Sequence, residues 1–540
     1  MDGFLQRLSN PAIAIPLVLF VIFSIYNRLT NVSNIPGGVP WVGKDTSKML
    51  AGTRASIAGF NDFRKWLEDA YDKYGKKNIS YILPDSFAEP KVILPRSQLA
   101  WLVDQPDDIL SASAFHHDSL EGDYAFTSPV ITKAPYHEHV IHKYLPRRVA
   151  SLVPEMWEEV QAAIDQTWGT NTREWRDIGI WQNMMRVIPS VTNRMMVGPQ
   201  VCRNEDFLEN MGKFAMDVIT CSTVYLRFTP RFLKPLVGPL VSIPNTRHWR
   251  NTTKYTLPII KERLANFKRK QEDPSFHWDE PNDYISWHIN LAMAEGRHDE
   301  LTPDMISRRL MPINFAAIHT TALTITSAIF DLFSSPHSLE WLRGIREEAE
   351  RAFAEEGGQW TKNSLARCHR ADSAIRESMR LSNFMALNVV RKVIPAEGIE
   401  NKVGGWRAPQ GALLGIDMHS VQHDPEIYPD PNTYDPFRFS RVRETSDTLN
   451  VHRKVNGTGT GTTGLITTSD IFLPFSHGRH ACPGRFFVAC EMKLILAYIA
   501  MNYEIEPLDS RPPNTWFGQN VIPPMKATIR VRRREDMTGQ

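Results

Sequence analysis

The ten residues Phe475-Ser-His-Gly-Arg-His-Ala-Cys-Pro-Gly484 direct the interpretation of the whole chain. They place Cys482 in a predicted turn between two glycines, directly before a helical stretch that begins at Arg485. A thiolate is a strong, soft ligand that suits iron, and a helix N-terminus helps to keep the sulfur ionised. Glycine permits positive φ and the close approach of a bulky planar group. Cys482 is therefore either a metal ligand or a buried structural cysteine in an ordinary turn.

The composition indicates a globular protein with a large core. The chain has 540 residues, of which 42% are hydrophobic and 23% are charged. Its formal net charge of +2 does not favour nucleic acid or an acidic polymer as a partner. The cysteines are widely spaced, form no Cys-x-x-Cys pair and indicate a reducing compartment rather than a disulfide framework or a zinc site. The five are Cys202, Cys221, Cys368, Cys482 and Cys490.

An uncharged stretch over residues 11–26 lies near the N-terminus. It is shorter than the roughly 20 residues that span a bilayer, although the window 8–29 reaches that length. A secretory signal peptide is the alternative, but no Ala-x-Ala-like cleavage site follows. We expect residues 1–34 to form an uncleaved transmembrane anchor and residues 35–540 to form one globular domain.

The predicted elements of the globular part alternate in type and then become mainly helical. Apolar spacing predicts a helix over 60–74, a strand pair over 79–83 and 91–94, and a helix over 96–104. From 140 to 381 the spacing is mainly helical. A Gly-Thr stretch lacks the Lys-Ser/Thr ending of a phosphate-binding loop, so a flexible insertion is favoured there.

The segment 301–333 predicts a long buried helix. Thr302 and Pro303 provide an N-cap and a first-turn proline. No Lys, Arg, Asp or Glu occurs between Met311 and Phe330, as in a membrane span. The run nevertheless contains a proline, an asparagine, a histidine and four threonines. These polar residues favour a helix that crosses the protein interior.

Five residues of the opening stretch match the haem-binding signature Phe-x-x-Gly-x-(Arg/His)-x-Cys-x-Gly, so the chain resembles cytochrome P450 monooxygenases of the microsomal, filamentous-fungal type. The resemblance implies a mostly α (α+β) haem-thiolate fold with small β-sheets. It also implies haem b (iron protoporphyrin IX) as the cofactor, with Cys482 as the axial iron ligand. His480 stands where the family usually has arginine. The matching residues are Phe475, Gly478, His480, Cys482 and Gly484.

The stretch Ala-Ala-Ile-His-Thr-Thr that begins at Ala316 is similar to the family's (Ala/Gly)-Gly-x-(Asp/Glu)-Thr-Thr groove. By this resemblance, Ala316 and Ala317 let the backbone approach bound oxygen. The Thr320 hydroxyl holds a water that delivers protons, with His319 and Thr321 as neighbouring catalytic candidates. His319 replaces the family's acid. Two alternatives remain open: Thr320 bonds to the carbonyl four residues earlier, and His319 is an ordinary core histidine.

Three further residues are expected to form a structural network. Glu377 and Arg380 lie three residues apart, so they share a helix face and can pair. Arg438 matches the arginine that, in the family, locks onto this pair. The resemblance implies a buried network that braces the haem side of the core and takes no part in the chemistry.

Haem-propionate contacts are less well defined by the sequence. The resemblance places Arg391 and His480 at such contacts. The family's Trp-x-x-x-Arg motif has no clean match, so His137 and His142 are the alternatives. A zinc site at these histidines is not favoured, because no fourth ligand has suitable spacing.

The resemblance implies a monooxygenase that inserts one atom of O2 into a lipophilic small molecule, such as a fungal terpenoid or related secondary metabolite. NADPH-cytochrome P450 reductase would supply electrons, since no flavin or dinucleotide motif is present. The implied location is the endoplasmic reticulum membrane, with the catalytic domain in the cytosol. Residues 232–243 are either a buried loop or a lid that contacts lipid. An oxygen-independent haem isomerase or dehydratase, and a haem-based sensor, are the alternative functions; Thr320 argues against the first.

Overall fold

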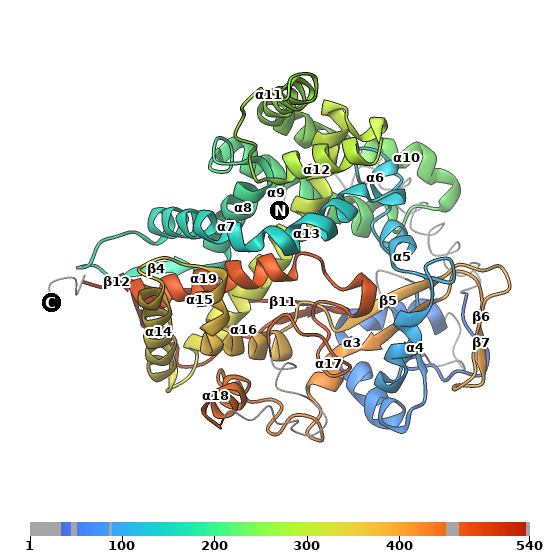
Figure 1. The fold of residues 1–540 in the computed structure, drawn as a ribbon. Coiled ribbons are helices and arrows are strands. Elements are labelled where there is room, and N and C mark those ends of the chain that lie inside the picture. The colour runs from blue at the N-terminus through green and yellow to red at the C-terminus, as the bar shows by residue number, and fades with distance from the viewer. Residues whose placement is uncertain (1–33, 45–50, 86–88, 450–463, 536–540) are drawn as a thin grey trace, which may run out of the picture. The chain divides into compact units, whose positions relative to one another are not determined.

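The computed structural model describes residues 34–44, 51–85, 89–449 and 464–535 (Figure 1). The predicted membrane span and most of the Gly-Thr stretch lie outside these residues. The chain divides into two compact units. Unit 1 comprises Met1–Lys133, Met216–Asn245 and Val390–Asp417, and unit 2 comprises Ala134–Ala215, Thr246–Val389 and Met418–Gln540.

Unit 1 is built on a five-stranded sheet of order β1-β2-β8-β5-β3. The predicted strand pair is confirmed: β1 and β2 are antiparallel, with Tyr81 opposite Ile93. β2 continues the sheet by pairing parallel to β8. All residues of β1, β2 and β8 are buried, which explains their mainly apolar sequences; Lys91 and Asp417 are the buried charged exceptions. The strands are β1 Tyr81–Leu83, β2 Lys91–Leu94, β3 Leu110–Ser111, β5 Leu387–Val393 and β8 Leu413–Asp417.

The helix predicted over 60–74 is longer than expected and begins at Ala51, whereas the one over 96–104 divides into a 3-10 turn and a short α-helix. The helical elements of unit 1 are α3 Ala51–Lys73, η1 Gly75–Lys77, η2 Arg96–Gln98, α4 Leu99–Asp104, α5 Ala112–Ser119, α6 Val130–Lys133, η3 Thr220–Leu226, η4 Arg231–Leu233 and α10 Lys234–Val241. A separate two-stranded sheet consists of β6 Ile399–Asn401 and β7 Trp406–Ala408.

The apolar stretch 232–243 is not a buried loop, so that alternative is wrong. It forms η4 and α10, and its large apolar side chains are exposed. Gly238 faces the body of unit 1, because a Cβ there would lie 2.3 Å from the Tyr124 ring. The side chains that point outward are Phe232, Leu236, Leu240 and Ile243, with exposures of 66%, 67%, 62% and 58%.

Unit 2 is a helical assembly around α13, which packs against α8 and α16, while α7 packs against α8 and α19 (Figure 1). α13 begins as predicted, since the Thr302 hydroxyl accepts a hydrogen bond from the backbone N–H of Met305 at 3.2 Å. By length and composition α13 is the one helix in the described ranges that is able to cross a membrane. In its most apolar window, 67% of the residues are buried, as expected for a core helix.

The helices of unit 2 and of its boundaries are α7 Tyr136–Trp168, α8 Ile180–Val197, α9 Glu205–Ile219, α11 Ile243–Glu272, α12 Tyr284–Ala294, η5 His298–Glu300, α13 Pro303–Phe333, α14 Ser338–Glu355, α15 Lys362–Arg367, α16 His369–Leu381, α17 Met418–Gln422, α18 Ser440–Leu449, η7 Gly478–His480 and α19 Arg485–Asn502. Its small sheets have the orders β4-β12-β9 and β10-β11. Their strands are β4 Arg176–Gly179, β9 Tyr503–Glu506, β10 Thr515–Phe517, β11 Asn520–Ile522 and β12 Thr528–Arg533.

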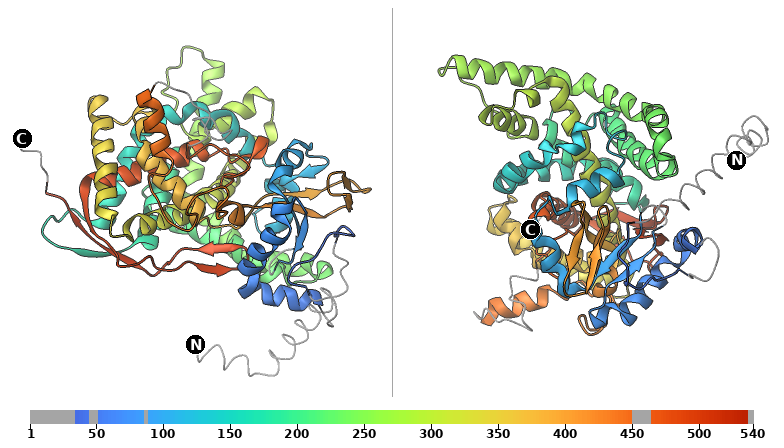
Figure 2. Two further views of the ribbon diagram at one scale, coloured as in Figure 1. Left: turned by 90° about the horizontal axis from the view of Figure 1, so that it is seen from below. Right: turned by 90° about the vertical axis from the view of Figure 1, so that its right-hand side faces the viewer.

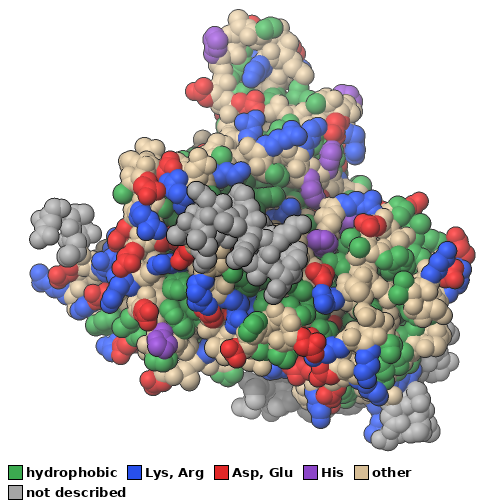
Figure 3. Space-filling view, turned by 60° about the horizontal axis from the view of Figure 1, so that its bottom comes forward, with side chains coloured by type: hydrophobic (Ala, Val, Ile, Leu, Met, Phe, Trp, Pro, Cys, Tyr) green, Lys and Arg blue, Asp and Glu red, His purple; other side chains and the backbone are tan. Residues whose placement is uncertain are grey.

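The described fold is mostly helical with small sheets, as predicted. On the face drawn in Figure 3, acidic and basic side chains are interspersed, which agrees with the small net charge of +2.

Candidate active site

The cysteine loop closes on itself immediately before α19. The backbone N–H of Cys482 donates to the carbonyl of Phe475 at 2.8 Å, which joins the two ends of the loop. Gly478 has φ of 73° and begins the η7 turn, so a side chain there would be strained. Ser476 also has a positive φ, of 59°, which is uncommon outside glycine. The backbone therefore holds the Cys482 thiol at one position ahead of the helix.

The surroundings of Cys482 have opposing effects on the pKa of its thiol. Burial raises the pKa of the thiol, whereas the Gly484 and Arg485 N–H groups and the Arg485 charge lower it. A metal cation at the sulfur would add the positive charge needed to remove the proton. A Cβ built on Gly484 would lie 3.8 Å from the Cys482 sulfur, an ordinary contact. The polypeptide's own packing thus does not require glycine at 484, and space remains beside the sulfur for a bound group.

The middle of α13 presents one accessible face within an otherwise buried helix. Five of its six residues that are not buried lie on one side of the helix, within an arc of about 120°, and the sixth, Phe315, lies on another side. Two of them are alanines, so a planar group can come close to the backbone here. This face, like the cysteine loop, fits a haem. The residues are Ile313, Ala316, Ala317, Thr320 and Leu323.

Thr320 lies on this face and hydrogen-bonds within its own helix. Its hydroxyl donates to the Ala316 carbonyl at 2.6 Å, which is the back-bonded alternative. A hydroxyl that donates in this way keeps its lone pairs, so it can still accept a hydrogen bond from water. Thr321 points elsewhere: it is 1% exposed, and its hydroxyl has no hydrogen-bond partner among the described residues.

His319 is turned away from the accessible face. It is 8% exposed, and its ring centroid lies 6.5 Å from that of Trp181 on α8. Burial lowers the pKa of the imidazole, so the ring is neutral at neutral pH. Its Nδ1 atom has no hydrogen-bond partner in the described part of the chain, so His319 is not a fully satisfied core histidine. No motif in the sequence singles out Trp181.

The structure brings Glu377, Arg380 and Arg438 together. Arg380 donates to both carboxylate oxygens of Glu377 at 2.8 Å, and both side chains are completely buried. The Arg438 Nε atom donates to the same carboxylate at 2.9 Å. The two arginines also donate to backbone carbonyls, those of Gln422 and Pro431 from Arg380, and those of Pro429, Asp430 and Thr433 from Arg438.

The residues expected at haem propionates lie in different units. Arg391 is 3% exposed in β5 of unit 1, where one guanidinium nitrogen donates to the Val390 carbonyl at 3.0 Å. His480 is half-buried at the end of η7 in unit 2, two residues before Cys482.

The histidines at the start of α7 do not converge on a common point. His137 is buried, and desolvation, assisted by Arg309 and His288, lowers its pKa to about 3. His142 is exposed, and its Nδ1 atom lies 3.0 Å from the Glu138 carbonyl. Within the described ranges, no three or more His, Cys, Asp and Glu side chains are arranged to hold a metal ion.

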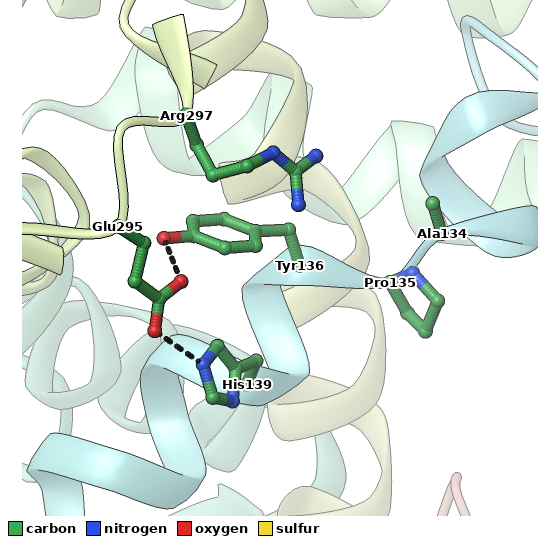
Figure 4. A pocket seen from close by; sticks show the side chains of 6 residues that line it. All are labelled: Ala134, Pro135, Tyr136, His139, Glu295 and Arg297. Carbon is green, nitrogen blue, oxygen red and sulfur yellow. Dashed lines mark hydrogen bonds and ion pairs between the residues drawn. The ribbon is translucent and has the colours of Figure 1, made fainter. Parts of the chain in front are cut away.

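His139 instead contributes to a surface pocket of about 370 Å³ (Figure 4). Its Nε2 atom lies 2.9 Å from one Glu295 oxygen, and the Tyr136 hydroxyl donates to the other at 3.0 Å. The Arg297 guanidinium lies 5.1 Å from the centre of the Tyr136 ring. The polar groups of this pocket therefore have their interaction partners within the pocket itself, at the surface of unit 2.

Glu138 is a residue that the sequence reasoning missed. Its charge raises the pKa of Cys482, so it lies in the electrostatic environment of the thiol. Burial raises the pKa of Glu138 itself. Glu138 and His142 are four residues apart on α7, the same spacing as in Trp-x-x-x-Arg. That spacing is the only signal for this pair in the sequence, since neither residue type matches the motif.

The mostly helical fold and the cysteine loop fit a haem-thiolate protein, and comparison with known proteins gives the family. The cytochrome P450 sequence profile matches residues 137–531. The chain is 30% identical to cytochrome P450 monooxygenase gloP of Glarea lozoyensis, covering 98% of this chain and 97% of the relative. It is 32% identical to cytochrome P450 monooxygenase htyF of Aspergillus rugulosus, covering 93% and 74%. A further relative, polB of Polytolypa hystricis, is 29% identical, covering 93% and 94%.

The chain belongs to the cytochrome P450 family and is a monooxygenase, that is, an oxidoreductase. The family implies a haem-thiolate cofactor, O2, a lipophilic substrate and a redox partner that supplies electrons. The cysteine loop and the accessible face of α13 fit that cofactor.

Proposed function

We propose that this monooxygenase inserts one oxygen atom of O2 into a C–H or C=C bond of a fungal terpenoid or related secondary metabolite, with haem b as its cofactor. The observation that carries the proposal is the closed loop that holds the Cys482 thiol ahead of α19. When bound, a haem supplies the activation of O2. The polypeptide supplies the iron ligand, the shape of the site and the control of protons.

Cys482 is the axial ligand in this proposal, and the loop keeps its sulfur available as thiolate. The Gly484 and Arg485 N–H groups and the Arg485 charge favour the ionised sulfur, which opposes the effect of burial. Phe475 holds the loop closed because its carbonyl accepts the hydrogen bond from the Cys482 N–H. Gly478 permits the turn because it adopts a positive φ.

The cofactor would be held between this loop and α13. Ala316 and Ala317 allow close approach at the α13 face. His480 and Arg391 are assigned to the propionates, because an imidazole and a guanidinium both donate hydrogen bonds to carboxylates.

Proton control is assigned to the segment that contains His319, Thr320 and Thr321. Thr320 donates to Ala316 and retains lone pairs with which it can hold a water on the accessible face. His319 is neutral, since burial lowers its pKa, so it can pass a proton only by exchanging its tautomer. The Thr321 hydroxyl, which has no hydrogen-bond partner in the part of the chain that the structure describes, is a further polar group on the same turn. The network of Glu377, Arg380 and Arg438 is assigned a structural role.

We assign residues 1–34 to a single-pass anchor in the endoplasmic reticulum membrane and residues 35–540 to a cytosolic catalytic domain. The exposed apolar side chains of η4 and α10 support lipid contact, because such side chains are rarely clustered on a water-facing surface. NADPH-cytochrome P450 reductase is assigned as the electron donor. The exposed cations Lys143, Arg147 and Arg148 on α7 support docking of an acidic partner.

Reconstitution with the reductase tests this function. NADPH consumption that requires O2, the reductase and an added terpenoid, and that yields an oxygenated product, is the expected result. Conversion of substrate without NADPH would indicate an isomerase or dehydratase. Spectral binding without turnover on any member of a terpenoid panel would indicate a sensor.

A further inference from the structure

The outer face of α11 carries a row of basic side chains. The row has five members, and all five side chains are exposed. Since successive residues of an α-helix are rotated by 100°, the five lie within an arc of about 60° around the helix axis. With a rise of 1.5 Å per residue, the row extends for about 32 Å. We call this surface the α11 basic row; its members are Arg247, Arg250, Lys254, Lys261 and Lys268.

The packing of α11 fixes the direction of this row. The opposite side of the helix carries Thr252, Thr256 and Ile260, each 0% exposed. Phe267 continues the same buried side and is 5% exposed. Because this side is held in the core of unit 2, the basic row points to solvent. Figures 1 and 2 show α11 at the edge of that unit.

Four of the five charges of the row have no ion-pair partner among the described residues. No ion pair joins its first four members to any residue of the described ranges, and Lys268 pairs with Glu272 at 3.8 Å. The exposed acid Glu262 lies about 60° around the helix from Arg247, outside the row.

The neighbouring helix α9 brings acids to a different side of α11. Asp206 of α9 accepts a hydrogen bond from Tyr255 at 2.8 Å, and Tyr255 lies about 80° from Arg247 around α11. Glu209 of α9 pairs with Lys213 at 2.7 Å. From Arg247 to Lys261 the basic row is therefore a cationic edge without an ion pair in the described ranges, and only its last member, Lys268, has a counter-charge, from Glu272.

We propose that the α11 basic row is a docking surface for the anionic headgroups of a lipid membrane. The row follows one side of α11 over about 32 Å, with Pro258 inside the helix between Lys254 and Lys261, so several of its cations can meet a flat surface together. Ile243, the first residue of α11, lies on the same side and is 58% exposed, as expected where a helix begins to enter the apolar zone. This apolar end favours a lipid surface over an acidic protein.

The proposal deepens the assigned membrane location and predicts lipid selectivity. Each Lys or Arg close to an anionic leaflet strengthens binding by about fivefold. The full-length holoenzyme should therefore bind vesicles with 30% phosphatidylserine more tightly than pure phosphatidylcholine vesicles, and 0.5 M NaCl should remove the difference by screening.

Flotation of the variant Lys254→Gln/Lys261→Gln provides the test. Its preference for phosphatidylserine over phosphatidylcholine should fall about 25-fold, while its binding to pure phosphatidylcholine stays unchanged. The matched control is Lys362→Gln/Lys526→Gln, which removes two other exposed lysines and should retain the preference. Hydrogen exchange of α11 should slow on phosphatidylserine vesicles only in the native protein and the control.

Equal preferences in the two variants would overturn the proposal. A change in self-association without a change in vesicle binding would also overturn it and indicate that the row contacts a protein. If the native protein did not bind phosphatidylcholine vesicles, the assigned apolar attachment to the membrane would be refuted. Binding to phosphatidylserine vesicles that still depended on the α11 basic row would, in that case, continue to support the proposal for the row. Failure to bind either vesicle would refute both.

Discussion

The buried carboxylate of Glu377 allows a quantitative prediction of stability. Glu377 is 0% exposed and is the only acid that meets both Arg380 and Arg438 in the described structure, at 2.8 and 2.9 Å. Glu377→Ala removes that acid and leaves the fully buried Arg380 guanidinium without a counter-charge. Removing one partner of such a pair costs about 3–5 kcal/mol. Because domains are stable by only about 5–15 kcal/mol, this loss is a large fraction of the total.

The assay is equilibrium unfolding of the holoenzyme in urea, followed by the Soret band and by Trp fluorescence. A fall of about 3–5 kcal/mol in the free energy of unfolding is expected for Glu377→Ala. Arg438→Lys should also lower the free energy of unfolding, but by less than Glu377→Ala does. Lysine keeps the positive charge but loses the planar, multidentate donor geometry of arginine.

The matched control is an exposed pair of the same chemistry. Arg530 and Glu506 lie 3.3 Å apart, with side chains 54% and 55% exposed. Arg530→Ala should change the free energy of unfolding by less than about 1 kcal/mol. If Glu377→Ala were as mild as Arg530→Ala, the reasoning from burial would be refuted.

Other predictions concern the site, the pH and the membrane. Cys482→Ala should abolish the thiolate band of the reduced CO complex, and a retained band would identify another ligand. Thr320→Ala should divert NADPH consumption into peroxide; an unchanged product yield per NADPH would exclude Thr320 from proton control. Burial raises the pKa of Glu348 from 4.5 to about 7, so the folded protein binds a proton there that the unfolded chain lacks. Stability should consequently fall as pH rises from 4.5 through 7, by up to about 3 kcal/mol. Glu348→Gln should flatten that slope in urea titrations at pH 5 and 8, and an identical slope would contradict the assignment. Deletion of residues 1–29 should weaken attachment to microsomes, measured by carbonate extraction; undiminished attachment would mean that the anchor lies elsewhere.

Local chemistry made several elements predictable. The Thr302 cap and Pro303 mark the start of α13 because they act on backbone groups within one turn. The pairing of Glu377 with Arg380 follows from helical spacing alone. The participation of Arg438, 61 residues from Glu377, was predictable only through resemblance, since no local rule relates residues so far apart.

Other features depended on which surface each side chain meets. The stretch 232–243 is equally apolar whether it is buried or exposed, and the contact of Gly238 with Tyr124 determines which side faces inward. Glu138 matches no motif by residue type, and only the packing of α7 brings its charge near Cys482. His319 lies in a motif, but its neutral state comes from burial beside α8.

The linear sequence was sufficient for the cysteine loop, the helix caps and the family, because these depend on residue types at fixed spacing along one segment. Tertiary structure decided the direction of His319, the surroundings of the Cys482 thiol and the exposure of the α11 basic row. Burial and electrostatic environment arise from segments that are distant in sequence and close in space, so they appear only when the chain is folded.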